Sequence, residues 1–375
     1  MSSVSSNRGY AEIHLGAFEH NVRELKSKVK TQLMIVVKAD AYGHGAVPCA
    51  LAARSAGADW LGVAYVDEAL QLRHNKVAGP ILAWLLHPED NFEEALSESI
   101  DLSVSTLDQL HRINQVAQKL DVEASIHIEI DTGLSRSGIP LENLETWLTE
   151  VKNSSHCKLI SLWSHLAASE DLSHRANEVQ LQNFQAAIQL ADEIGVSYEF
   201  VHVANSAATL LSPELHFGMV RCGIAAYGVT PGGDVGDIKG HNLRPVMRIV
   251  SEIAQVRRLE TGDGVSYNHT WIASKPTNVG LIPVGYADGI PRSAGNKAQI
   301  TYQGKQFPIV GTVCMDQFVV DFGDEDIRVG DEIEIFGNGI DAHTFNQTTG
   351  GIGYELVTRI GSRLEKRYVD SHEHL

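Results

Sequence analysis

Eight apolar runs of strand length recur at regular intervals through the first two-thirds of this 375-residue chain. They are nearly continuous in apolar residues, which is typical of parallel strands covered by helices on both faces. Stretches with helical periodicity separate them, and eight such units in about 240 residues predict a (β/α)8 barrel. An open doubly wound sheet is the alternative, but no GxGxxG turn follows any of the runs. The runs are Gln32–Lys38, Trp60–Tyr65, Ile81–Leu85, Leu102–Ser105, Ala124–Asp131, Leu159–Leu166, Phe200–Ala204 and Val220–Ala226.

The pattern changes after His241. Short apolar segments joined by turns replace the strand–helix alternation, and long helical patterns are absent until about Tyr354. Tyr302–Lys305 (YQGK) is typical of a hairpin turn. We therefore predict a barrel domain over residues 1–241 and a mostly β domain over residues 242–375, joined by the Gly- and Asp-rich segment Pro231–Gly240.

Charge and cysteine content exclude several classes of function. The net charge of −17 disfavours binding to nucleic acid, because an acidic surface repels phosphate backbones. The four cysteines lie far apart and the chain has neither a CxxC pair nor an HExxH motif, so we expect no disulfide scaffold and no metal site. No run approaches the roughly 18 apolar residues of a membrane span, and we expect no signal peptide. These features predict a soluble cytoplasmic enzyme.

Polar side chains fall repeatedly where the predicted barrel strands end. Chemistry in (β/α)8 barrels takes place at the C-terminal ends of the strands. A single charged residue at a strand end indicates only that solvent begins there. Five strand ends with the same property indicate a site, and its members are Lys38, Arg136, His165, Asn205, Ser206, Arg221 and Gly223.

The segment Val36–Gly45 (VVKADAYGHG) closely resembles the pyridoxal-phosphate attachment site of alanine racemases. The resemblance continues in order through both predicted domains, and eight ordered motifs are far more specific than one. The other segments are Asp131–Arg136 (DTGLSR), Asn205-Ser206, Arg221–Ile224 with Tyr227-Gly228, Val265–Tyr267 (VSY), Gly285–Gly289 (GYADG), Met315-Asp316 and Tyr354-Glu355.

The resemblance implies pyridoxal 5'-phosphate held as a Schiff base on Lys38. Arg221 would hydrogen-bond the ring nitrogen, supported by His165, and Arg136 would bind the phenolic oxygen and the substrate carboxylate. An arginine keeps its proton, so the ring nitrogen would stay largely neutral. The phosphate would be bound by Tyr42, Ser206, Tyr354 and the N–H groups of Gly223 and Ile224.

Racemisation needs a proton removed from one face of Cα and returned on the other. The resemblance assigns Lys38 to the D-alanine face and Tyr267 to the L-alanine face, with Tyr267 and Met315 supplied by the second subunit of a homodimer with composite sites. Tyr286 would act as a gate, with Asp316 in support. The implied activity is the interconversion of L- and D-alanine, which supplies D-alanine for the cell wall.

The chain departs from the family pattern at several positions. Glu129 stands where many members carry a carbamylated lysine, so we predict no carbamate and expect Glu129 to hold Arg136 as a fixed anion. Thr312 replaces a frequent arginine, Trp84 a common leucine and Cys222 a common proline, and these changes bear on substrate breadth.

Other functions stay open at the level of the sequence. A broad-specificity or serine racemase shares most of these motifs. A fold-related pyridoxal-phosphate decarboxylase would need a Gly-rich phosphate loop after the seventh strand, which is absent here. A non-catalytic cofactor carrier would generally lack the second domain.

Overall fold

The computed structural model describes residues 8–369, and its first large sheet is the predicted barrel. The eight parallel strands lie in the order β10-β2-β3-β4-β5-β6-β8-β9. Backbone hydrogen bonds from Gly218 N–H to the Val201 carbonyl (3.1 Å) and from Arg221 N–H to the Ala204 carbonyl (2.9 Å) connect the two ends of this sheet. The strands are β2 (Gln32–Val36), β3 (Trp60–Val63), β4 (Ile81–Ala83), β5 (Asp101–Val104), β6 (Ala124–Asp131), β8 (Cys157–Trp163), β9 (Phe200–His202) and β10 (Met219–Cys222). The short strand β7 (Ile139–Pro140) pairs with β6.

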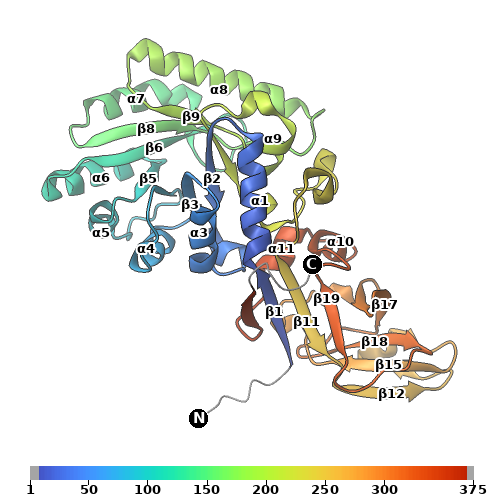
Figure 1. The fold of residues 1–375 in the computed structure, drawn as a ribbon. Coiled ribbons are helices and arrows are strands. Elements are labelled where there is room, and N and C mark those ends of the chain that lie inside the picture. The colour runs from blue at the N-terminus through green and yellow to red at the C-terminus, as the bar shows by residue number, and fades with distance from the viewer. Residues whose placement is uncertain (1–7, 370–375) are drawn as a thin grey trace.

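Helices cover the outside of the barrel (Figure 1). In α6 (Leu107–Leu120), Thr106 and Gln109 form a capping box at the first turn, and the buried residues Leu110, Ile113 and Ala117 follow the helical spacing. The others are α1 (Leu15–Lys28), α3 (Ala46–Ser55), α4 (Val66–His74), α5 (Phe92–Ser97), α7 (Leu144–Asn153), α8 (Arg175–Ile194) and α9 (Ser206–Leu211).

A left-handed turn follows β2, in the segment labelled α2 (Lys38–Tyr42). Its last four residues have φ values of 52° to 54°. This left-handed conformation costs each L-residue roughly 1–2 kcal/mol of conformational energy. Outside contacts stabilise the turn. Glu68 accepts the Ala39 N–H (2.7 Å), and Asp40 forms an ion pair with Lys366 of the C-terminal domain. The sequence placed Lys38 at the end of the first strand, whereas the strand ends at Val36 and Lys38 begins this turn.

The C-terminal domain is mostly β, as predicted. Its nine-stranded sheet has the order β12-β15-β18-β17-β16-β19-β11-β1-β20. The hairpin turn predicted at Tyr302–Lys305 joins β16 to β17, with φ of +48° at Gln303 and +76° at Gly304. The strands after β10 are β11 (Met247–Glu252), β12 (Gln255–Leu259), β15 (Thr277–Ile282), β16 (Gln299–Tyr302), β17 (Lys305–Val310), β18 (Phe318–Gly323), β19 (Glu332–Phe336) and β20 (Glu365–Val369). A separate ribbon pairs β13 (Gly264–Val265) with β14 (Trp271–Ile272).

The predicted domain boundaries need one correction. Strand β1 (Gly9–His14) was assigned to the barrel domain, residues 1–241, but it lies in the second sheet between β11 and β20 (Figure 1). Its residues Ala11 and Ile13 are fully buried there, and Ala11 pairs with Ile249. The C-terminal domain also contains α10 (Ala342–Gln347), which the sequence did not predict, and α11 (Gly353–Thr358).

Candidate active site

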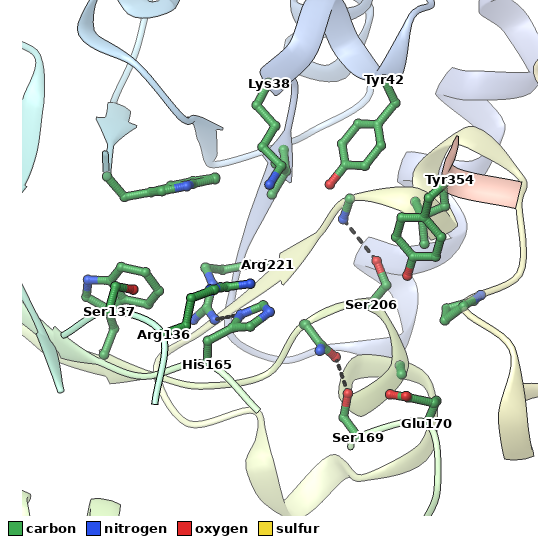
Figure 2. A pocket seen from close by; sticks show the side chains of 18 of the residues that line it. Lys38, Tyr42, Arg136, Ser137, His165, Ser169, Glu170, Ser206, Arg221 and Tyr354 are labelled. Atoms are coloured by element: carbon green, nitrogen blue, oxygen red, sulfur yellow. Dashed lines mark hydrogen bonds between the residues drawn. The ribbon is translucent and has the colours of Figure 1, made fainter. Parts of the chain in front are cut away.

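A cavity of ≈ 450 Å³ opens at the C-terminal ends of the barrel strands. Most of its wall comes from the barrel, and α11 of the second domain closes one side with Tyr354 (Figure 2). The cavity brings together eleven residues that the sequence predicted, namely Lys38, Tyr42, Glu129, Arg136, His165, Asn205, Ser206, Arg221, Gly223, Ile224 and Tyr354. Sequence reasoning did not predict the lining residues Trp163, Ser137, Ser169 and Glu170.

Lys38 reaches into this cavity from the left-handed turn. Its Nζ lies 5.8 Å from the centre of the Trp84 ring. Burial lowers the pKa of Lys38, and the nearby cation of Arg136 lowers it further, while the Glu68 carboxylate opposes the change. The neutral amine is therefore more populated than in an ordinary lysine. Only that form is a nucleophile or a base.

Arg221 lies at the floor of the cavity, with only 5% of its surface exposed. It donates to His202 Nδ1 (2.7 Å), His165 Nδ1 (3.2 Å) and the Ser164 carbonyl (2.8 Å). Burial and the Arg221 charge lower the pKa of His165 to about 3, so its ring is a neutral acceptor. The predicted contact between His165 and Arg221 is therefore present. His202 was missed, although a histidine inside the apolar run FVHVA is as unusual as Glu129 in its own strand.

A set of hydroxyl and amide groups gathers at the opposite side of the cavity. Ser206 Oγ accepts the N–H of Gly223 (2.9 Å), and the Tyr42 and Tyr354 rings lie 6.4 Å apart (Figure 2). Burial raises the pKa of both tyrosines, so both hydroxyls keep their protons and can donate. A Cβ built at Gly223 would lie 2.3 Å from Tyr42 Oη, so a larger residue here would require the buried Tyr42 side chain to move.

This donor set fits a phosphate group, because neutral hydroxyls and backbone N–H groups are the partners that an oxyanion requires. Asn205 supports the set from behind. It caps α9 through the Ala208 N–H (3.1 Å) and accepts the Ser169 hydroxyl (2.8 Å). These contacts give Asn205 a structural role beside the donor set.

Sequence profiles of two domains match almost all of the chain. The alanine racemase N-terminal domain matches residues 13–231, and the alanine racemase C-terminal domain matches residues 246–368. The chain belongs to the alanine racemase family. It is 39% identical over 370 residues to the alanine racemase of Frankia casuarinae, covering 96% of each chain.

Solved structures of the family share the whole fold. The alanine racemase of the D-cycloserine producer Streptomyces lavendulae superposes with a TM-score of 0.96 at 39% identity, covering 99% of each chain. The alanine racemase of Bartonella henselae superposes with a TM-score of 0.87 at 30% identity, covering 96% of this chain and 99% of that one. The Bartonella structure contains covalently bound pyridoxal phosphate.

Glu129, where this alanine racemase departs from the family pattern, is buried but does not hold Arg136 directly. Its carboxylate accepts the Ser137 hydroxyl (2.9 Å), and within residues 8–369 it forms no ion pair with Arg136, whose charge acts on it without direct contact. Burial raises the pKa of Glu129, while Ser137, Arg221 and Arg136 act in the opposite direction. The expected contact with Arg136 is therefore corrected to a hydrogen bond with Ser137. The charges of Arg221 and Arg136 still act on the Glu129 carboxylate without direct contact.

We expect Glu129→Gln to lower kcat/KM by roughly 5- to 30-fold, the usual worth of one charge-assisted interaction. The loss arises because the anion that faces Arg221 and Arg136 disappears while the shape of the side chain is kept. Steady-state racemisation measures it, with Ser137→Ala as the control that removes only the hydrogen bond. Activity of the natural chain should not change when CO2 is depleted. Wild-type kinetics in Glu129→Gln would contradict a role for this charge.

Tyr267, Met315 and Tyr286 do not line the cavity of their own chain. Their exposed fractions are 68%, 52% and 42%, and all three lie in the C-terminal domain. The loop that holds Tyr267 has positive φ values at Ser266, Asn268 and His269, and Thr312 donates to the Tyr267 carbonyl (3.3 Å). Asp316 is paired with Arg363 (2.7 Å), which also bonds the buried Asp288 (3.1 Å). These residues are presented to the outside of the single chain.

Proposed function

We propose that the chain interconverts L- and D-alanine with Lys38 and Tyr267 as the two acid–base groups, and that Lys38 carries pyridoxal 5'-phosphate covalently. The observation that carries the proposal is the cavity. It contains a lysine of lowered pKa, a buried arginine and a set of hydrogen-bond donors that suit a phosphate group. Covalently bound pyridoxal phosphate in the Bartonella henselae relative supports the cofactor assignment. The cofactor supplies the electron sink that makes the Cα proton of alanine acidic.

The residues that line the cavity bind the cofactor and substrate and transfer the proton. The neutral amine of Lys38 accepts or returns a proton on one face of Cα. Arg221 would meet the ring nitrogen as a donor that keeps its proton, since its pKa, although lowered to about 10 by burial, stays well above neutral pH. Arg136 supplies a cation for the substrate carboxylate. Tyr42, Ser206, Gly223, Ile224 and Tyr354 bind the phosphate.

The second acid–base group requires a second subunit. Tyr267 is exposed in a loop with unfavourable backbone angles, a kind of strain that clusters at functional sites. We propose a homodimer in which Tyr267 and Met315 of one chain complete the cavity of the other, with Tyr286 as a gate. The proposed role is the supply of D-alanine for the cell wall. A cytoplasmic location stays a prediction. Within residues 8–369, the structure contains no helix that is long and apolar enough to span a membrane.

Loss of optical activity tests the function. Protein reconstituted with pyridoxal phosphate is incubated with L-alanine and, in parallel, with L-serine. We expect alanine to react faster, although a pocket discriminates such close analogues by only about 10- to 200-fold. Comparable rates would indicate a broad-specificity racemase, and no reaction of either amino acid would refute the proposal.

The lowered pKa of Lys38 predicts how cofactor attachment depends on pH. Removing the Arg136 cation with Arg136→Gln raises the pKa of Lys38, so the unreactive ammonium persists to higher pH. The pH midpoint for covalent attachment, followed by visible absorbance of the apoprotein mixed with cofactor, should therefore move upward. Arg136→Lys keeps the charge and should leave the midpoint near that of the natural chain. Equal midpoints in all three proteins would contradict the electrostatic cause.

A further inference from the structure

A continuous series of side-chain hydrogen bonds runs from Arg221 through the interior of the barrel. Arg221 Nη1 contacts His202 Nδ1 (2.7 Å), and His202 Nε2 contacts Ser161 Oγ (3.0 Å). Ser161 Oγ contacts His127 Nδ1 (2.6 Å), and His127 Nε2 contacts Asp101 Oδ2 (3.1 Å). The five residues lie on neighbouring strands, and His202, Ser161 and His127 are completely buried.

Arg221 at one end of the series determines the direction of the first two hydrogen bonds. A guanidinium can only donate, so His202 Nδ1 must accept. Burial and the Arg221 charge lower the pKa of His202 well below its usual value, so this ring is neutral and its single proton is on Nε2. Nε2–H then donates to Ser161 Oγ.

The hydrogen bond at the Asp101 end of the series also has a fixed donor. Asp101 as a carboxylate can only accept, so His127 donates to it from Nε2. With a single ring proton used on Asp101, His127 has a free lone pair on Nδ1, which can accept the Ser161 hydroxyl. This leaves a Ser161 lone pair facing His202. All four bonds are satisfied in one arrangement that begins at a cation and ends at an anion.

We propose that Ser161, with His127 and Asp101 behind it, is a positioning residue that keeps His202 in its Nε2–H tautomer, so that Nδ1 always accepts from Arg221. In the other tautomer, two N–H groups would face each other in the dry interior, and a buried donor without an acceptor is unfavourable. The Trp163 ring stacks on the His202 ring, with 5.7 Å between the ring centres and an angle of 4° between the ring planes. Stacking fixes the plane of the imidazole but does not distinguish its tautomers, whereas the hydrogen-bond partners do.

The consequence for the site follows from the position of Arg221. Two of its other acceptors are the backbone carbonyls of Ser164 and Val203, which hold one side of the guanidinium. Within the described part of the chain, His202 is the only hydrogen-bond partner of Nη1, so loss of this acceptor frees that nitrogen to turn. The effect on racemisation rests on the proposed function, but the tautomer of His202 does not.

Histidine-labelled apoprotein therefore tests the inference separately from catalysis. Imidazole ¹⁵N shifts should show one neutral Nε2–H tautomer for His202, identified by its loss in His202→Gln. In Ser161→Ala, Nε2–H loses its acceptor, so the second tautomer of His202, with Nη1 of Arg221 turned away, should become populated. Ser161→Thr should restore the single form. The matched control is Ser103→Ala. It removes another buried hydroxyl, the acceptor of Trp163 Nε1–H (2.8 Å), and should leave His202 unchanged.

Kinetics of the reconstituted enzyme give the second readout. We expect kcat to fall about 10-fold in Ser161→Ala, with KM for alanine changed less than about twofold, and to recover in Ser161→Thr. The visible absorption of the bound cofactor should change with it, because the proposed function places Arg221 at the ring nitrogen. A single unchanged His202 tautomer in Ser161→Ala overturns the proposal, as does an equal effect of Ser103→Ala. Should racemisation be absent in every protein while the tautomers behave as expected, the proposed function fails and the positioning role stands.

Asp101 offers a second variant pair if Ser161→Ala does not fold. Asp101 lies at the less buried end of the series, so it is the safer position to change. Asp101→Ala removes the acceptor and should release His127, and to a smaller extent His202, from a single tautomer. Asp101→Asn keeps an acceptor oxygen and should preserve both. Identical spectra for Asp101→Ala and the natural chain would also overturn the proposal.

Discussion

Lys38→Ala is expected to abolish racemisation, lowering kcat by roughly 10⁴- to 10⁶-fold, the range seen when a covalent catalytic residue is removed. The change deletes both the proposed attachment point of the cofactor and one of the two acid–base groups. The Lys38 side chain is only partly buried and lies just after an apolar strand, so the chain should still fold without it. Racemisation of L-alanine and the visible absorbance of protein mixed with pyridoxal phosphate measure the two losses separately.

Lys38→Arg is the matched control. It retains the positive charge and most of the length, but its guanidinium is not a nucleophile. Both variants should keep the far-ultraviolet circular dichroism of the natural chain while losing the band of the bound cofactor. A Lys38→Ala protein that kept that band and more than about a hundredth of the activity would refute the assignment of Lys38.

Tyr267→Phe is expected to lower kcat by about 10²- to 10⁴-fold, the usual contribution of a positioned acid–base group. Phenylalanine keeps the ring and loses only the hydroxyl. Because Tyr267 is 68% exposed in the single chain, the loss cannot come from damage to the core of that chain. The thermal midpoint of the protein should stay within a few degrees of the natural one, while the rate falls for both L- and D-alanine.

Mixing variants shows whether Tyr267 acts on the partner subunit. Random exchange between Lys38→Ala and Tyr267→Ala chains makes half of the dimers mixed, each with one intact site, so about a quarter of natural activity should return. Mixing Lys38→Ala with Arg221→Ala is the control, because both residues belong to the cavity of one chain and every mixed site stays defective. No recovery in the first mixture, with exchange verified, would contradict the composite site.

The barrel could be predicted because each of its strands carries its own signal. An apolar run of strand length, followed by a helical stretch, is a local property that the neighbours in sequence specify. Strand β1 carries a weaker signal and was assigned to the wrong domain. Its pairing with β11 and β20 depends on segments far along the chain, which no local pattern reveals.

Some members of the candidate site could be found from local motifs, whereas the contacts of others depend on tertiary packing. Lys38, Arg221 and Gly223 were found because they stand in motifs at the ends of strands. Glu129 was recognised as unusual, but its direct hydrogen bond is with Ser137, and Arg136 acts on it only through its charge. Ser137 lies on a loop whose path is set by tertiary packing. His202 and His127 each read as a lone histidine in an apolar strand.

The sequence by itself determined the alternation of strands and helices in the barrel, the family, and the residue types needed to hold an anionic cofactor beside a lysine. Only the tertiary structure decided which buried groups meet. Arg221, His202, Ser161, His127 and Asp101 come from five different strands, and closure of the barrel brings them within hydrogen-bond distance. The physical reason is that secondary structure depends on the period of nearby side chains, whereas a hydrogen bond in the core depends on the register of strands that are distant in sequence.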